Sequence, residues 1–376
     1  MKKLAKITLW IVASVMLIAL TAYGVAVSYK KEMLSVINEK IGESINGTVQ
    51  INDFSITLFH DFPNISLSLK GISLRGPQHE KYKHDFLSAG VIDLNVEAMK
   101  LLHKQVNIKS IDVLNGDVFI FRTKDGYLNL DIFKKQNKKD TTSLSNNVSI
   151  SFEKINFRNV RLAFHDSLKE KLFGATFVRT ENRIISKDTS LHAHIAGDID
   201  FEQITFNLSK GSFLENKHAV ANISLEFFFP SKRLVIEPSM LKLEKSLINL
   251  SGAMKFLPQG GGDFQIKIQS DKVDFEEGLA VITQSMRNSL SKFSIERPVA
   301  IQVNLNGQLG SAKPPATDGK FTIRDSHISW SVYELKNSFV QGSFTNHKDD
   351  LLWFDDANTE IKLDSLQGVL KNLPFK

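Results

Sequence analysis

The sequence predicts a mainly β protein that follows a single N-terminal transmembrane helix. Three observations predict this fold class: an uncharged apolar stretch near the N-terminus, a repeated alternation of apolar and polar residues along most of the remaining chain, and a scarcity of helical patterns. The length of 376 residues allows two or three domains or one elongated structure.

The composition is that of a folded protein, with 42% hydrophobic and 23% charged residues. The net charge of +6 is spread over the whole chain, so we expect no nucleic acid partner. The absence of Cys excludes disulfides, a thiol nucleophile and cysteine-ligated metals. The aromatic residues are 27 Phe against 5 Tyr and 3 Trp, which indicates apolar surface without polar groups attached.

The N-terminal stretch, residues 7–27, is the predicted membrane helix. It is uncharged, and its 21 residues at ~1.5 Å each cross the ~30 Å hydrocarbon core of a bilayer. The lysines before it, Lys2, Lys3 and Lys6, place residues 1–6 in the cytoplasm, although Lys30 and Lys31 weaken the charge asymmetry. The alternative is a cleaved signal peptide, but the apolar run is longer than such peptides need.

Residues 28–46 form a predicted amphipathic helix directly after the membrane segment. Its apolar residues, Leu34, Ile37, Ile41 and Ile45, recur at helical spacing, and Asn46-Gly47 provides a C-terminal stop. We expect this helix to cap the first edge of the sheet; lying on the membrane surface is the alternative role.

Period-two alternation dominates from Thr48 onward and predicts strands with one apolar and one polar face. The apolar residues of the clearest strands are our candidates for lining an apolar surface, with Phe206, Phe227 and Phe264 the bulkiest. These candidates are Ile65, Leu67, Leu69, Ile204, Phe206, Leu208, Ile223, Leu225, Phe227, Phe264, Ile266, Ile268, Ile301, Val303 and Leu305.

Turn residues and one polar segment divide the region into modules. Turns are predicted at Asn115-Gly116, at Asp125-Gly126, and at residues 258–262 and 313–315. The polar residues 134–147 read as a linker or long loop between a first module, residues 47–133, and a second, residues 148–376. Within residues 47–376, two helices are predicted. One covers residues 275–293, with Leu279, Ile282, Met286 and Leu290 on one face, and a short one covers residues 97–103.

A sheet with one apolar face must cover that face with a second sheet, with helices or with something that is not protein. The predicted helices are too few for this. Periodicity alone therefore favours tandem β-sandwiches, and the alternative is a long, curved antiparallel sheet whose apolar face is an open groove.

Two N-terminal stretches resemble the AsmA family of bacterial envelope proteins. The first is residues 47–76, GTVQINDFSITLFHDFPNISLSLKGISLRG; the second is residues 86–133, which contains Leu101-Leu102, Asn115-Gly116 and Asp125-Gly126 where the family has them. Leu130 departs from the family pattern, in which a tryptophan is common. The resemblance implies a signal-anchored protein of the Gram-negative inner membrane with its body in the periplasm. It also implies a repeating β-groove like that of bridge-like lipid transfer proteins, and so favours the groove over the sandwiches.

The resulting hypothesis is a non-enzymatic protein without cofactors that binds or conducts phospholipid between the inner and outer membranes. It would support outer-membrane biogenesis and protein assembly, with membrane phospholipids and envelope proteins as its partners. Lipid chains need a continuous apolar path because each exposed CH₂ costs about 0.8 kcal/mol in water. The alternative is a scaffold for outer-membrane protein assembly that touches no lipid.

Four patterns in the sequence could suggest a chemical site, and the sequence favours none of them. His192 and His194 alternate on one strand face near Asp198 and Asp200, which could suggest a metal site, but the pattern fits a solvent face. The remaining three patterns match no catalytic, calcium or phosphate-binding signature. They are His60-Asp61, the aspartate pairs 349–350 and 355–356 around Leu351-Leu352-Trp353-Phe354, and the glycines 260–262.

Overall fold

The computed structural model describes residues 45–57, 64–97, 108–133, 154–205, 212, 214–257, 261–280, 282, 284–309, 311, 313–354, 356–370 and 373–375. Outside these ranges lie the predicted membrane helix (7–27), residues 28–44 of the predicted amphipathic helix (28–46), His60-Asp61, residues 98–103 and the linker (134–147). Within them, no helix has both the length and the apolar character to cross a membrane.

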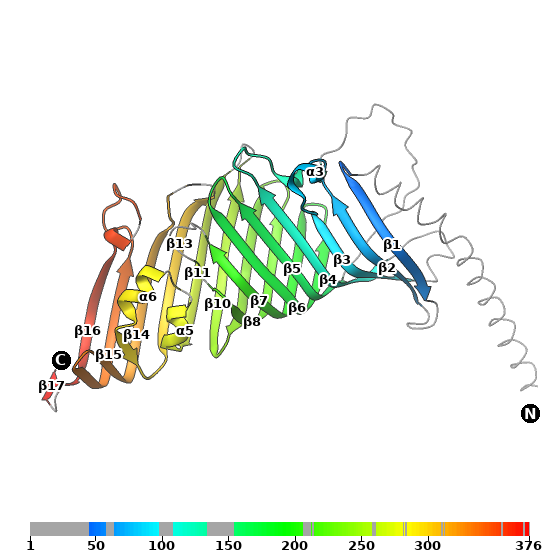
Figure 1. The fold of residues 1–376 in the computed structure, drawn as a ribbon. Coiled ribbons are helices and arrows are strands. Elements are labelled where there is room, and N and C mark those ends of the chain that lie inside the picture. The colour runs from blue at the N-terminus through cyan, green and yellow to red at the C-terminus, as the bar shows by residue number, and fades with distance from the viewer. Residues whose placement is uncertain are drawn as a thin grey trace, which may run out of the picture. The chain divides into compact units, whose positions relative to one another are not determined.

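Strands make up most of the described chain, with a few short helices between them (Figure 1). The strands are β1 (Thr48–Thr57), β2 (Asn64–Arg75), β3 (Leu87–Glu97), β4 (Ile108–Arg122), β5 (Lys154–Asp166), β6 (Lys171–Ser186), β7 (Ser190–Thr205), β8 (Lys217–Phe228), β9 (Arg233–Leu243), β10 (Ser246–Phe256), β11 (Gly262–Val273), β12 (Phe293–Ile295), β13 (Val299–Leu309), β14 (Ala316–Trp330), β15 (Tyr333–Thr345), β16 (Glu360–Leu370) and β17 (Leu373–Phe375). The helices are α3 (His79–Tyr82), α5 (Phe275–Ala280), α6 (Gln284–Leu290) and the 3₁₀ turns η1 (Asn129–Phe133) and η3 (Asp356–Asn358).

The chain divides into two compact units. Unit 1 contains Met1–Ile120 and Leu128–Val160, and unit 2 contains Phe121–Tyr127 and Arg161–Lys376. In unit 1, β1 to β4 pair antiparallel, each with the next strand in the sequence. The Asn156 side chain of β5 donates to Asp112 of β4 at 2.6 Å, within the same unit.

Unit 2 is an antiparallel ladder in which each strand pairs with its neighbour in the sequence, from β6 to β11 and from β13 to β17. β11 pairs directly with β13, and the short β12 pairs with β14. Each unit thus has one ladder and no second sheet among its described strands. The preference for sandwiches drawn from periodicity was therefore wrong, because alternation says which face is apolar but not what covers it.

One end of the unit 2 ladder carries a covered core. Val299, Ile323 and Leu335 are buried in a cluster against which Phe275 of α5 and Ile295 of β12 pack. Asp274 caps α5 by accepting from the Glu277 amide at 3.1 Å. The single helix predicted over 275–293 is two short helices followed by β12, and these are the α-helices in the described part of unit 2.

A row of Gly and Asn residues crosses the strands of unit 1. Neighbouring residues pair on both sides of Asn52, Gly71, Gly90 and Asn115, but no pairing joins these four positions themselves. Backbone φ is positive at Gly71 (59°), Asn115 (51°) and Asn159 (54°), and the Asn159 amide donates to Asn115 Oδ1 at 2.9 Å. We call this row the crease, and kinks of this kind bend a sheet.

The crease corrects one turn prediction. Asn115-Gly116 lies inside the continuous strand β4, because Asn tolerates positive φ within a strand and Gly116 fits closely against Val160. Asp125-Gly126, with φ of 88° at the glycine, is the turn that the sequence predicted.

Candidate functional site

The strand register of unit 2 brings apolar side chains from successive strands onto one face. Leu225 pairs with Ile236, Ile236 with Gly252, Gly252 with Ile266, and Ile266 with Leu305. Paired residues of a ladder point to the same side. We call this the apolar face of unit 2.

Nine of the predicted lining residues lie on the apolar face. They are Ile223, Leu225, Phe227, Phe264, Ile266, Ile268, Ile301, Val303 and Leu305. Ile204 joins them, since it pairs with Phe173, whose ring stacks on Phe164 at 6.0 Å. These ten candidates therefore share one apolar face, and their role in lining a lipid path stays a prediction.

The remaining candidates are not among the described residues of the apolar face of unit 2. Leu67 and Leu69 lie on the apolar side of unit 1, where Leu69 pairs with Phe54 and Ile92. The side chain of Ile65, and Phe206 and Leu208 altogether, lie outside the described residues.

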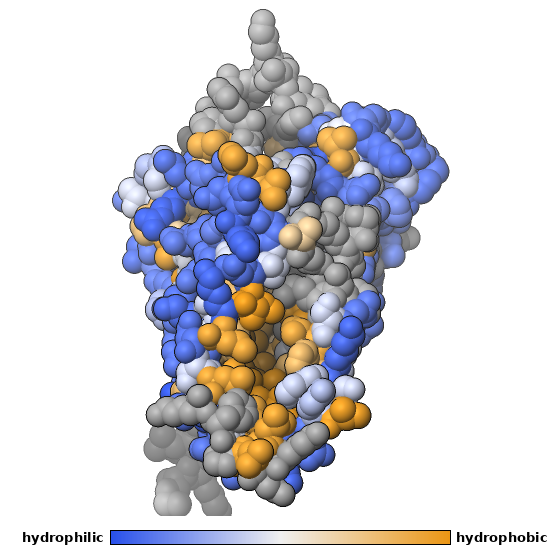
Figure 2. All heavy atoms as spheres, turned by 90° about the vertical axis from the view of Figure 1, so that its left-hand side faces the viewer, coloured by the Kyte–Doolittle hydropathy of each residue, from blue (hydrophilic) through white to orange (hydrophobic). Residues whose placement is uncertain are grey.

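The apolar face of unit 2 is only partly covered by protein. All nine residues keep an intermediate exposure, whereas Phe54 in unit 1 is 2% exposed. Figure 2, seen from the side of β16, shows apolar side chains lining a hollow between two hydrophilic walls. A closed sandwich would bury such residues, so this face is an open apolar surface.

Phenylalanine rings lie across glycines of the neighbouring strand on this face. Phe264 pairs with Gly307, Gly319 with Phe344, and Phe321 with Gly342. A Cβ added to Gly307 would lie 2.7 Å from the Phe264 ring, and one added to Gly342 would lie 2.7 Å from the Phe321 ring. Ring and glycine together fill the width of two strands with apolar surface, as in the aromatic rescue of glycines in sheets.

Sequence reasoning missed several members of this surface. Phe177, Met254, Phe321 and Phe344 lie on the apolar face through their pairing with Ile199, Phe264, Ile301 and Gly319 respectively. The alternation around Phe321 and Phe344 is interrupted by Gly and by small polar residues, so the period-two signal was weak there. The signal that could have found them is a phenylalanine on one predicted strand placed opposite a glycine on the next.

A pocket lies at the edge of unit 2 where β10 and β13 end and β9 and β11 begin. It has a volume of about 680 Å³, within the range of small-molecule sites. Apolar Met254, Phe264 and Phe354 line it together with Arg233 and Lys255. We call it the rim pocket. Lys313 and Asp263 line it as well, so its cationic groups outnumber its one carboxylate, and this lining suits an amphipathic molecule with a negative head.

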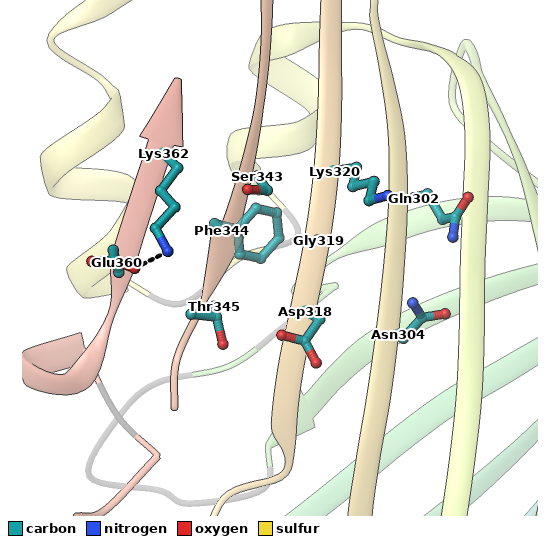
Figure 3. Close-up of a pocket in the computed structure, with 10 residues that line it drawn as sticks. All are labelled: Gln302, Asn304, Asp318, Gly319, Lys320, Ser343, Phe344, Thr345, Glu360 and Lys362. Atoms are coloured by element: carbon teal, nitrogen blue, oxygen red, sulfur yellow. Dashed lines mark ion pairs between the residues drawn. The ribbon is translucent and has the colours of Figure 1, made fainter. Parts of the chain in front are cut away.

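The opposite face of β13 to β16 is polar and holds a pocket of about 270 Å³ (Figure 3). Glu360 pairs there with Lys362 at 2.9 Å and with Lys348 at 3.0 Å. Hydrogen bonds from these two ammonium groups lower the pKa of Glu360 below its ordinary value. The carboxylate is thus engaged as an ion-pair acceptor, which does not suit it to act as a general base.

The four polar residues of β7 that could have suggested a metal site each contact a different neighbouring strand residue or share one partner in pairs. His192 Nε2 lies 3.1 Å from Glu226, and His194 Nδ1 lies 3.0 Å from Ser224. Asp198 and Asp200 instead face His218, at 3.6 and 2.7 Å. The four residues therefore share a strand face without forming one site.

A different trio on the same face could hold a metal ion. The ligand atoms of His192, Glu226 and Glu237 all lie within 4.8 Å of one another. Because ligand atoms in a zinc tetrahedron stand about 3.3 Å apart, the side chains would have to close in around an ion. Glu237 comes near through a register shift between β8 and β9, which the sequence alone does not reveal.

A family model described as the AsmA family matches residues 1–235, more than half of the chain. The chain belongs to the AsmA family. The match extends past the N-terminal stretches that carry the resemblance and into the strands of the apolar face. No curated protein and no solved structure matches the chain. For this AsmA family protein, the apolar face of unit 2 is the candidate functional site.

Proposed function

We propose that this AsmA family protein binds phospholipid on the apolar face of unit 2 and conducts it between two membranes. The observation that carries the proposal is the row of half-buried to exposed apolar side chains that continues from β6 to β16, with no second sheet over it among the described strands. Such a surface is costly in water and suits acyl chains, which gain about 0.8 kcal/mol per CH₂ removed from water.

The proposed mechanism depends on shape and apolarity. Acyl chains would lie against Ile266, Leu305 and their neighbours while the headgroup stays in water at the strand ends. Movement along the face requires no single essential side chain, because each strand offers an equivalent contact. We propose no catalytic group, and outer-membrane biogenesis would be served through lipid supply.

The proposed location is the inner membrane, with residues 7–27 as the anchor and the body in the periplasm. The uncharged length of that segment and the lysines before it support this placement. Family membership supports an envelope role.

Photocrosslinking tests lipid binding directly. A photoreactive phenylalanine analogue at Phe264, on the apolar face, should form phospholipid adducts detectable by mass spectrometry after irradiation of Gram-negative cells. The matched control places the same analogue at Gln269, which is exposed on the opposite face of the same strand. Equal adduct yields at the two positions would exclude the proposed surface and favour a lipid-free scaffold.

Conduction is tested by placing charge on the path. The double variant Ile266→Lys with Ile268→Lys should abolish lipid transfer and complementation of a deletion strain. Gln265→Lys with Gln269→Lys adds the same charge to the opposite face of β11 and should leave both intact. Full complementation by a folded Ile266→Lys, Ile268→Lys protein would show that lipid does not travel along this face.

A further inference from the structure

The loop between β15 and β16 displays three consecutive large apolar side chains to solvent. Leu351 is 94% exposed, Leu352 56% and Trp353 57%. We call residues 346–359 the tip loop; Asp355 within it lies outside the described residues. The sequence analysis found no catalytic or calcium signature in the aspartates around these residues and assigned no role to the apolar residues between them.

Hydrogen bonds to buried Asn358 hold the tip loop in one shape. Asn358 is 5% exposed, and its amide donates to the backbone carbonyls of Asp349 at 2.8 Å and Trp353 at 3.1 Å. Its side-chain oxygen accepts from the Asp349 amide at 2.9 Å. The exposed trio is therefore held in place before any partner arrives, so binding requires little further ordering.

The base of the loop is fixed to the ladder. Asn346 donates to the carbonyls of Phe354 at 3.1 Å and Pro315 at 3.0 Å. Lys313 Nζ lies 3.5 Å from the centre of the Phe354 ring and donates to the Asp350 carbonyl. Because Phe354 and Lys313 also line the rim pocket, the apolar tip stands beside an opening at the strand ends.

We propose that the tip loop inserts Leu351, Leu352 and Trp353 into the interface of a lipid bilayer. Trp places an apolar ring and a polar N–H at the level of the lipid headgroups, and the leucines supply apolar area below it. The loop projects beyond the strand ends (Figure 1) and exposes these three side chains, and a soft bilayer can accommodate them without a matching pocket. This inference goes beyond lipid conduction, since it fixes which part of the chain contacts a membrane surface.

The charges beside the tip specify the kind of bilayer. Asp349 and Asp350 flank the apolar residues, and Lys348 next to them is already paired with Glu360 at 3.0 Å. The loop itself therefore carries no excess of cations, and Lys313 at its base is held against the Phe354 ring and the Asp350 carbonyl, so we expect insertion into zwitterionic lipid without a requirement for anionic lipid.

A single labelled cysteine tests insertion, because the native chain contains no Cys. In full-length Leu351→Cys carrying a nitrobenzoxadiazole label, reconstituted into phosphatidylcholine vesicles, the label should brighten and be quenched by nitroxide-bearing phosphatidylcholine. The quencher is placed either in the same vesicles or in a second, added population, so that the experiment identifies which bilayer the tip enters. The control, Asp188→Cys, labels an exposed turn that should stay in water.

Quenching at position 351 from either population, with none at position 188, supports insertion. Absence of quenching from both populations overturns the proposal, and equal quenching at both positions does so too. Replacing Leu351, Leu352 and Trp353 together by Ser should weaken binding of the added vesicles about tenfold or more. Phospholipid adducts at Phe264 in that variant report separately on the apolar face, so failure of one proposal does not mask failure of the other.

Discussion

The pairing of phenylalanine rings with glycines explains part of the unusual aromatic composition. Three such pairs occur on the apolar face of unit 2, between β11 and β13 and twice between β14 and β15. Phe supplies apolar area with no polar group to satisfy, and glycine lets the ring lie close to the neighbouring backbone. The chain's 27 Phe against 5 Tyr fit such a surface.

Gly319→Ala should destabilise the protein by about 1–3 kcal/mol, because its Cβ would overlap the Phe344 ring and force it off its place. Urea denaturation of the variant measures the effect. Gly90→Ala is the matched control in another strand, where the new Cβ comes no closer than 3.4 Å to its neighbours. Gly319→Ala with Phe344→Leu should recover part of the loss, and strict additivity of the two changes would contradict the contact.

His347 connects the tip loop to β14. Burial favours the neutral ring, but hydrogen bonds to Asp318 and Asp350, each at 3.1 Å, outweigh burial and raise the pKa of His347 above its usual 6.5. A protonated imidazole donates from both nitrogens, whereas a neutral ring donates from only one.

Protonated His347 should therefore hold the tip loop more firmly than neutral His347. The raised pKa makes this stabilisation full below about pH 6.5 and lost as the pH rises through the folded-state value. Hydrogen exchange of the loop amides, corrected for the intrinsic rate, should be faster at pH 8 than at pH 6. His347→Gln should remove this difference, and an NMR titration giving a pKa at or below 6.5 would contradict the expected direction.

At the scale of the elements, the crease of unit 1 bends several strands along one line. Asn115 and Asn159 both have positive φ, and their side chains hydrogen-bond to each other across β4 and β5 within that unit. On either side of the crease, residues of β3 and β4 follow antiparallel pairing, as in Ala89 with Gly116 and Val91 with Leu114. The crease also shifts the alternation by one residue, because Leu69 before it and Ile72 after it pack into the same apolar cluster although they are three positions apart.

Asn115→Val should lower the free energy of unfolding by about 1–2 kcal/mol, since a β-branched residue is strained at positive φ. Asn115→Gly tolerates that φ and should cost less, losing mainly the bond with Asn159. Thermal or urea unfolding of the two variants provides the comparison. An Asn115→Val protein at least as stable as Asn115→Gly would mean that β4 does not need the kink.

Much of the ladder was predictable, and the limits have physical causes. Alternation located the strands around Ile223, Ile266 and Val303 and assigned their apolar face, because a strand has an exact two-residue repeat. It could not tell an open face from a closed one, since both need the same apolar residues. Asn115-Gly116 looked like a turn because turns and strand kinks require the same positive φ. The position of Glu237 near His192 and Glu226 depends on a register shift between β8 and β9, which cannot be predicted from the sequence.

At the scale of the whole molecule, the orientation of the chain across the membrane can be mapped with single cysteines. Lys124→Cys, in an exposed turn of unit 2, should react with a membrane-impermeant maleimide when the outer membrane is opened. Lys3→Cys should react only after the inner membrane is also permeabilised, because the proposed anchor leaves it in the cytoplasm. The reverse order of labelling would refute the proposed orientation.

The simple order of the unit 2 ladder, in which strands pair mostly with their sequence neighbours, also has an evolutionary consequence. Each added strand extends a sheet by about 4.8 Å, so duplicating one hairpin such as β10 and β11 would lengthen it by about 10 Å. The new strands would repeat the existing alternation and leave the other pairings untouched. A ladder of this kind can grow by copying hairpins, so that the length of its apolar face is inherited as a number of repeats.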